Sequence, residues 1–177
     1  MVVTDDEALA TRVRHLSTQA RLPGLSYDHD EVGYNYRLSN LASALGLAQL
    51  EELDTLLAGR RANGAFYDGL TAELPGLRPA PQAPWARPSY WLYTARLDPD
   101  APVDRDGLLA ALAAAGIEGR PIWTPLHLTK LYRDAPRIGG AVAEGIFRDA
   151  VSLPSSSNLG DAGRERVAAA LRAVLAS

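Results

Sequence analysis

The sequence predicts an α/β protein, in which a small layer of strands and helices packs behind one long helix. Two observations carry this prediction. From residue 89 to the end, strand-like and helix-like segments alternate, which is typical of an α/β layer. Before them, a long run with apolar residues at helical spacing begins at Ser39. A length of 177 residues with 47% hydrophobic side chains is enough for one globular domain.

The predicted elements begin with an apolar, strand-like stub at Met1–Val3. Residues Thr4 to Glu7 have the capping-box pattern, which predicts a helix from Thr4 to about Gln19. A strand of three residues must pair with something, so the chain begins as if in the middle of a domain. Residues 20–37 are polar and aromatic with proline and glycine at turn positions, which predicts an ordered loop.

The long helix is predicted from Ser39 to Glu73, because Pro75 and Gly76 end it. A proline-rich, extended linker follows over 79–88. The remaining elements then alternate: a strand over 89–97, a helix over 104–116 capped by Asp104, a strand over 117–123 weakened by Pro121, an irregular loop over 124–137, a helix over 141–148, a strand over 150–153 and a capped terminal helix over 161–175.

Composition excludes several classes of function. Eighteen basic against 21 acidic residues give a net charge of -3, so nothing attracts the chain to nucleic acid or to an anionic membrane. The chain has no cysteine, and its three histidines lack metal-ligand spacing, so no metal site is predicted. Apolar runs fall well short of the roughly 20 residues that span a bilayer. The acidic start is unlike a signal peptide, and we expect a cytoplasmic protein.

Lys130 is the only lysine, so any mechanism that needs a lysine must use it or take one from outside the chain. A lysine desolvated among apolar groups can form a Schiff base, because burial lowers its pKa. Lys130 instead lies in a predicted loop beside Arg133 and Asp134, a context typical of a solvated lysine.

The densest group of polar and aromatic side chains precedes the start of the long helix. Helix N-termini attract anions through unpaired N–H groups, and an upstream amide and guanidinium add directed donors. One interpretation is therefore a phosphate or carboxylate clamp made by Asn35, Arg37 and the helix start at Ser39. The alternative, favoured by spacing alone, is a loop in which Asn35 turns the chain and Arg37 pairs with Asp30 or Glu31.

A second group contains Arg120, Trp123, His127, Lys130 and Tyr132. His127 stands between two leucines, which is more typical of a half-buried, hydrogen-bonded histidine than of a catalyst. A third group, at 154–158, lacks the glycines of a nucleophile elbow or a P-loop. Spacing alone therefore leaves the function unnamed.

Three stretches occur in one order that resembles a known family. They are GYNYRLSNLASALGLAQL at 33–50, RPIWTPLHL at 120–128 and LPSSSNL at 153–159. They resemble the second half of the DegT/DnrJ/EryC/StrS-type sugar aminotransferases, which are pyridoxal-phosphate enzymes. The resemblance covers essentially the whole chain. It implies the C-terminal part of the aspartate-aminotransferase fold, with the end of the large domain and its active-site loop at 1–38, a long interdomain helix at 39–75 and a small α/β domain at 76–177.

The resemblance also implies roles for particular residues. Asn35 and Arg37 would reach across a homodimer interface to the phosphate of the partner's pyridoxal phosphate. Tyr36, Trp123 and His127 would contact the nucleotide-linked sugar, with the loop at 155–158 nearby. The implied reaction moves an amino group from glutamate to a keto-sugar, with the 4-keto position favoured.

The family's Schiff-base lysine, its ring-stacking aromatic and its pyridine-pairing aspartate have no counterpart here. No catalytic residue is therefore predicted within this chain, and the chain alone should be inactive. Two alternatives stay open: the C-terminal part of such an enzyme, or a noncatalytic binding or dimerisation module derived from one. Retention of Asn35, Tyr36 and Arg37 together favours the first.

Overall fold

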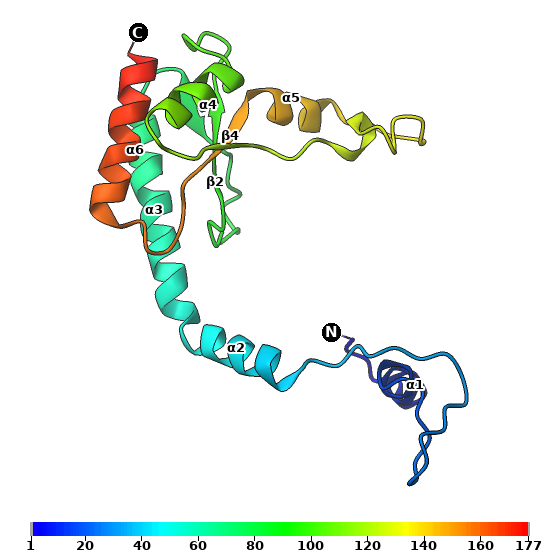
Figure 1. Ribbon diagram of the computed structural model, residues 1–177. Helices are drawn as coiled ribbons and strands as arrows, with labels where there is room; N and C mark the ends of the chain where they lie inside the picture. The colour runs from blue at the N-terminus through cyan, green and yellow to red at the C-terminus, as the bar shows by residue number, and fades with distance from the viewer. Residues whose placement is uncertain (1, 177) are drawn as a thin grey trace. The chain divides into compact units, whose positions relative to one another are not determined.

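The computed structural model describes residues 2–176, and the chain divides into two compact units, Met1–Glu52 and Leu53–Ser177 (Figure 1). Each unit is described by itself. No helix among residues 2–176 is long and apolar enough to cross a membrane.

The first unit begins with helix α1, Glu7–Ser17. Its cap is Asp6, whose carboxylate accepts hydrogen bonds from the N–H groups of Ala8 and Leu9. The predicted cap at Thr4 is wrong by two residues, because a charged carboxylate holds both N–H groups and favours the positive end of the helix dipole. The predicted strand is also absent over residues 2 and 3, which are exposed, and Met1 lies outside the described residues.

The loop after α1 is ordered, as predicted, and folds back on the end of the helix. Isolated β-bridges pair Thr18 with Asn35 and Arg21 with His29. Ala20 is fully buried within this turn and has a positive φ of 52°. A Cβ on Gly33 would lie 2.3 Å from the Ala20 nitrogen, so only glycine fits there. The loop is thus held by close backbone packing.

Helix α2, Asn40–Glu51, begins at the predicted place. Ser39 caps it by accepting a hydrogen bond from the Ala42 N–H at 3.2 Å. The predicted continuous helix is interrupted at Glu52, and α3 runs from Leu53 to Glu73. No side chain of α2 is buried, so tertiary packing does not stabilise a continuous helix at this position.

The second unit is built on a four-stranded antiparallel sheet of order β1-β2-β4-β3. The strands are β1 Leu77–Pro79, β2 Tyr93–Leu97, β3 Arg120–Pro121 and β4 Ala150–Leu153. Strand β4 has the predicted bounds. β2 starts four residues later than predicted, β3 is only two residues long, and β1 lies where the sequence predicted the stop of the long helix and the start of a linker.

The helices of this unit are α3, α4 Arg105–Ala114, α5 Ala141–Asp149 and α6 Gly160–Leu175, with a short 3-10 turn, η1, at Leu126–Leu128. Asp104 caps α4 as predicted, and Gly116 follows it with a φ of +67°. Helices α3 and α4 pack on the sheet, and α6 packs on both of them (Figure 1). Side chains from these helices, from alternate positions of β2 and from β1 and β4 form the core.

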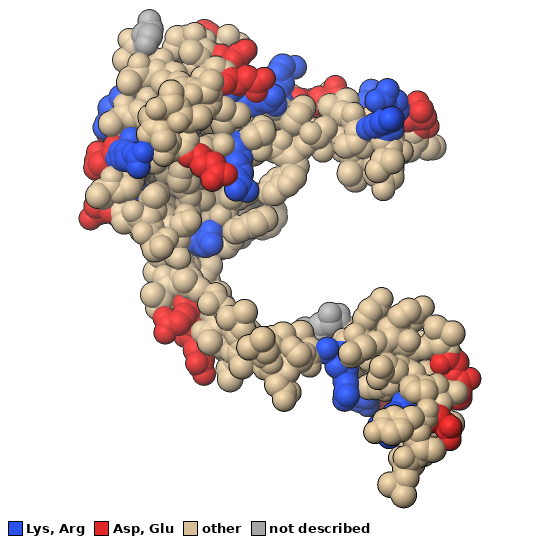
Figure 2. Space-filling view, in the orientation of Figure 1, with Lys and Arg blue, Asp and Glu red and all other residues tan. Residues whose placement is uncertain are grey.

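The face of the molecule seen in Figure 2 carries no large patch of charge of one sign. Basic and acidic side chains are interspersed, and much of the surface is neither.

Candidate functional site

The residues of the predicted anion clamp lie where the loop of the first unit returns to α1. The Tyr34 N–H donates to the Leu16 carbonyl at 2.7 Å, and the Tyr36 N–H donates to the Ser17 carbonyl at 3.1 Å. The Tyr34 and Tyr36 rings stack with centroids 5.1 Å apart. These contacts fix the backbone of 34–36 against the end of α1 while the side chains of Asn35 and Arg37 stay exposed.

The carboxylates of this loop are paired with residues of α1. The Arg12 guanidinium binds both carboxylate oxygens of Glu31, and His15 Nε2 lies 2.7 Å from Asp30 Oδ1. The hydrogen bond from His15 lowers the pKa of Asp30. The interpretation in which Arg37 pairs with Asp30 or Glu31 is therefore not what the structure shows.

Arg37 has no partner in the part of the chain that the structure describes. Over residues 2–176, its guanidinium makes no hydrogen bond or ion pair. It lies two residues before the Ser39 cap of α2, so a free cation and a helix N-terminus are close along the chain. A free guanidinium is the group that a phosphate or carboxylate binds best.

His15, Asp30 and Glu31 also place three potential metal-ligand atoms within 4.8 Å of one another. Arg12 already occupies both oxygens of Glu31, so the negative charge of that carboxylate is balanced by the chain itself. The group functions in the structure as a link between α1 and the loop.

In the second unit, His127 is hydrogen-bonded and half-buried. Its Nε2 lies 2.9 Å from Glu144 Oε1, and Glu144 also accepts from Arg137 at 3.0 Å. The hydrogen bond with His127 is the main reason that the pKa of Glu144 is lowered. Gly140, with a φ of +113°, lets the chain pass close to the imidazole, since a Cβ there would lie 3.0 Å from His127 Cε1.

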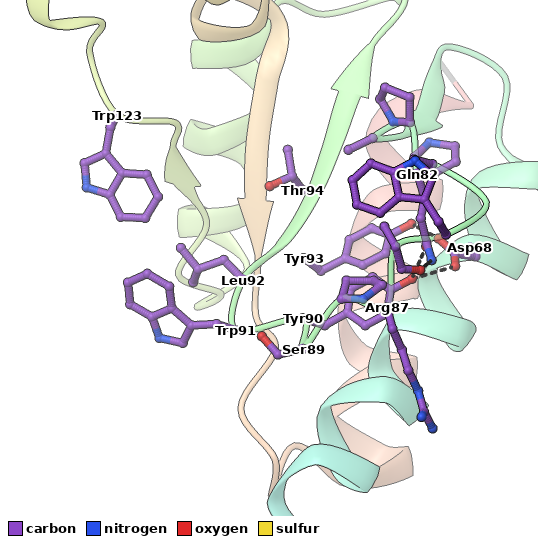
Figure 3. A pocket seen from close by; sticks show the side chains of 17 residues that line it. Asp68, Gln82, Arg87, Ser89, Tyr90, Trp91, Leu92, Tyr93, Thr94 and Trp123 are labelled. Carbon is purple, nitrogen blue, oxygen red and sulfur yellow. Dashed lines mark hydrogen bonds between the residues drawn. The ribbon is translucent and has the colours of Figure 1, made fainter. Parts of the chain in front are cut away.

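Trp123 lies at a different place from His127. It lines a cavity of about 920 Å³, whose wall is formed mainly by residues 79–83 and 85–94 (Figure 3). Its ring stacks on Trp91 with centroids 5.8 Å apart and planes at 27°. His127 is not among the residues that line this cavity, so the structure does not bring Trp123 and His127 into one wall. Tyr36 belongs to the first unit.

Two tyrosine hydroxyls hold the floor of the cavity, one to α3 and one to the segment before β2. The Tyr93 hydroxyl donates to Asp68 Oδ1 at 2.7 Å, and the Tyr90 hydroxyl donates to Gln82 Oε1 at 3.2 Å (Figure 3). Burial, reinforced by the Asp68 carboxylate, raises the pKa of Tyr93 far above its ordinary value. Both hydroxyls therefore stay protonated donors that hold the cavity in shape.

Sequence reasoning missed Trp91 as a site residue. The run SYWLYTARL predicted a strand, but β2 starts only at Tyr93 and leaves Ser89 to Leu92 in the cavity wall. The available signal was the concentration of three aromatic residues within four positions, Tyr90, Trp91 and Tyr93. The structure also leaves Lys130 exposed, as predicted for a solvated lysine.

The fold matches a little under half of the solved aminotransferase TlmJ from Streptoalloteichus hindustanus, with 27% identity and a TM-score of 0.83. The model of the DegT/DnrJ/EryC1/StrS aminotransferase family matches residues 1–172, and the chain belongs to this family. The resemblance found in the sequence and the predicted fold class are both confirmed.

Three relatives illustrate the match. EpsN of Bacillus subtilis (strain 168), named as a pyridoxal phosphate-dependent aminotransferase, is 38% identical over 172 residues, 94% of this chain and 44% of EpsN. The GDP-perosamine synthase of Caulobacter vibrioides is 36% identical over 99% of this chain and 47% of that protein. The crystal structure of S. venezuelae DesV matches with a TM-score of 0.78 and 33% identity, over 97% of this chain and 45% of DesV. The chain thus spans a little under half the length of these relatives.

Proposed function

We propose that this chain acts as the C-terminal half of a pyridoxal phosphate-dependent enzyme that transfers an amino group from glutamate to a keto group, the 4-keto group, of a nucleotide-linked sugar. The observation that carries the proposal is membership of the aminotransferase family over residues 1–172. The names of two relatives add the cofactor, in EpsN, and a nucleotide sugar, in the GDP-perosamine synthase.

Asn35 and Arg37 would hold the phosphate of the cofactor, within a homodimer in which each loop serves the partner's site. The donors of this chain fit that group, because the Arg37 guanidinium is exposed and, within residues 2–176, unpaired. The fixed backbone of 34–36 limits the conformational entropy lost when the phosphate binds. The cofactor, when bound, carries the amino group from donor to acceptor.

On the substrate side, Trp123 would supply an apolar wall, while Tyr36 and His127 would supply hydrogen-bonding groups. Glu144 orients the His127 ring through its 2.9 Å contact with Nε2, so the ring can present its other nitrogen in a fixed direction. In this proposal, the Trp123 ring excludes water from the sugar, and Tyr36 and His127 position the sugar by hydrogen bonds.

The chain by itself should not transfer amino groups. Transamination in this fold needs a lysine that binds the cofactor and moves a proton, and Lys130 lies exposed in the turn after η1. The lysine of the active site would therefore come from the other half of the enzyme. We also propose that the assembled enzyme is cytoplasmic.

The test is reconstitution. The 177-residue chain is incubated with pyridoxal phosphate, glutamate and a nucleotide-linked 4-keto-sugar, alone and after co-expression with a lysine-bearing N-terminal half from a family member. We expect amino-sugar product only with the second chain present. Turnover by the chain alone would contradict the proposal that the active-site lysine comes from the other half of the enzyme. No turnover in a complex that binds the cofactor would leave the noncatalytic module as the function.

A further inference from the structure

The loop that contains Arg37 carries more acidic than basic side chains. Residues 20–37 include three carboxylates and two guanidiniums, and two of the carboxylates, Asp30 and Glu31, come shortly before Arg37. A free carboxylate repels a phosphate, and it also binds a guanidinium in the same bidentate geometry as a phosphate does. This loop can therefore bind an anion well only if its own carboxylates are neutralised.

The structure pairs both of these carboxylates with helix α1. The Arg12 guanidinium binds both carboxylate oxygens of Glu31, with Nη2 2.6 Å from Oε2. His15 Nε2 lies 2.7 Å from Asp30 Oδ1 and 3.6 Å from Glu31 Oε1. The hydrogen bond with His15 lowers the pKa of Asp30, so Asp30 is a charged carboxylate at neutral pH. Each carboxylate that precedes Arg37 thus already has a partner on α1.

The same end of α1 holds the backbone that precedes Arg37. The segment 34–36 donates hydrogen bonds to the carbonyls of Leu16 and Ser17. Leu16 lies one helical turn, or about 6 Å along the axis, after Arg12. Charged side chains one turn apart on a helix surface are close enough to form ion pairs. Both carboxylates would therefore be within reach of Arg37 if α1 released them.

The two ion pairs are not the main reason that the loop keeps its place. The side chains of Arg12 and Asp30 are roughly half exposed, and exposed ion pairs contribute little to stability. The loop is held instead by its backbone hydrogen bonds and by the close approach of Gly33 to the turn after α1. The larger consequence of the ion pairs is on charge. In the part of the chain that the structure describes, the Arg37 guanidinium makes no hydrogen bond or ion pair.

We propose that Arg12 and His15 are positioning residues, which neutralise the two carboxylates of the loop and so keep Arg37 free for the cofactor phosphate. If either α1 residue is lost, the released carboxylate binds Arg37 and repels the phosphate. The two α1 residues thus act on the anion through the carboxylates. The inference rests on the proposed function for the identity of the phosphate, but inorganic phosphate tests it without any amino transfer.

The first test is the affinity of the 177-residue chain for inorganic phosphate, followed by the NMR signal of the Arg37 Nε–H group. Arg12→Ala should weaken phosphate binding by roughly 2- to 15-fold, the effect of one unit charge about 10 Å from the anion. Without phosphate, the Arg37 Nε proton should exchange more slowly in this variant, because Glu31 then accepts a hydrogen bond from it. Arg12→Lys should retain most of the affinity, since the charge remains. Hydrogen exchange of the Tyr34 and Tyr36 amides should be unchanged.

The second test separates neutralisation of a carboxylate from a purely structural role of Arg12. The double variant Arg12→Ala, Glu31→Gln has no released carboxylate at this position, so it should recover most of the phosphate affinity. A structural link would be as broken in this double variant as in the single one. The control is Arg12→Ala, Asp28→Asn, which has the same net charge but leaves Glu31 unpaired and should recover less. Asp28 is exposed and accepts a hydrogen bond from the Ser26 hydroxyl at 2.6 Å.

The second ion pair allows an independent repeat of this test. His15→Ala should weaken phosphate binding, because Asp30 then has no partner on α1. Asp30→Asn in the same chain should restore the affinity. Loss of affinity in both single variants should become smaller at high salt, where the released charges are screened.

The outcomes separate this inference from the proposed function. Phosphate binding that is weakened by Arg12→Ala and recovered by Glu31→Gln supports the inference even if reconstitution yields no amino transfer. The inference is overturned by unchanged phosphate affinity in Arg12→Ala, by equal recovery in the Glu31 and Asp28 double variants, or by no phosphate binding to the parent chain at millimolar concentration. An active reconstituted enzyme with the same Kd for pyridoxal phosphate in Arg12→Ala as in the parent would overturn the inference and leave the proposed function standing.

Discussion

At the scale of single residues, charged side chains of this protein divide into those that are paired and those that are free. Arg12 and Arg96 each bind a carboxylate through two nitrogens. Arg37 binds no group of residues 2–176. A paired arginine contributes to stability, whereas a free one beside a helix start is available to a ligand.

Removal of Arg37 should weaken cofactor binding. A hydrogen bond to a charged group contributes about 1.5 to 3 kcal/mol, so Arg37→Ala should raise the Kd for pyridoxal phosphate roughly 10- to 150-fold. The measurement is a cofactor titration of the reconstituted two-chain enzyme. Arg133→Ala is the control for loss of an exposed charge. Unchanged cofactor affinity in Arg37→Ala would remove this residue from the site.

The Arg96–Asp149 pair should make the free energy of unfolding depend on pH in the acidic range. Arg96 donates to both carboxylate oxygens, at 2.7 and 2.6 Å, and these bonds are the main reason that the pKa of Asp149 lies below its ordinary value of 3.8. A lowered pKa means that the carboxylate contributes stability at pH values above about 4 and that the contribution is lost as the pH falls through the folded-state pKa.

The measurement for this pair is urea unfolding between about pH 6 and pH 2. The parent protein should lose more free energy of unfolding over this range than Asp149→Asn, in which the residue cannot titrate. Asp106→Asn is the control, because Asp106 also pairs with an arginine but is 75% exposed and should contribute little. Parallel pH profiles for the parent and Asp149→Asn would contradict the assignment.

At the scale of elements, side-chain caps determine where helices begin, while close backbone contact holds the loop at 20–37 in place. Ser39 and Asp104 cap their helices with side-chain oxygens. The loop, in contrast, lacks a cap or a regular ladder and is fixed by its approach to the turn at Gln19 and Ala20. This approach positions Asn35 and Arg37.

Gly33→Ala should detach this loop. The new Cβ would lie 2.3 Å from two backbone atoms, the Ala20 nitrogen and the Gln19 carbonyl carbon, neither of which can rotate away. Overpacking of this kind costs about 1–3 kcal/mol or more. Hydrogen exchange should show lost protection at Tyr34 and Tyr36.

Gly46→Ala is the matched control for this prediction. Nothing lies within 4 Å of a Cβ at Gly46, and the residue is inside α2, so alanine should stabilise the helix by roughly 0.5–1 kcal/mol. The two substitutions therefore have opposite signs. Equal protection of Tyr34 and Tyr36 in both variants would show that the approach at Gly33 does not hold the loop.

At the scale of the whole molecule, the apolar surface of α2 is the main unexplained feature. Four leucines of this helix are exposed, and Figure 2 shows little charge along it. Their exposed fractions are 81% for Leu41, 63% for Leu45, 58% for Leu47 and 64% for Leu50. Exposed apolar surface of this extent favours association.

We therefore expect the chain to self-associate in solution, in line with the proposed homodimer. Sedimentation velocity over a concentration series should show a species larger than 18.9 kDa. The double variant Leu41→Glu, Leu45→Glu should shift it toward the monomer, because charged side chains oppose apolar contact. Gln49→Glu adds the same type of charge without removing a leucine and should have a smaller effect. A monomer at all concentrations would contradict the prediction.

The sequence by itself determined what depends on neighbouring residues. The start of α2 at Ser39, both ends of α4 and the bounds of β4 were predicted, because caps, glycine turns and short apolar runs act within a few positions. The order of three short stretches also identified the family, which the family model confirms.

The tertiary structure decided what depends on residues far apart in the chain. Trp91 meets Trp123 across 32 positions, and Arg96 meets Asp149 across 53. Strand β1 exists because Leu77 pairs opposite Leu97 of β2, not because its three residues favour a strand. The interruption at Glu52 reflects the lack of buried side chains on α2. Such features follow from packing, which no local pattern encodes, and the stacked tryptophans are visible only once the sheet has brought their segments together.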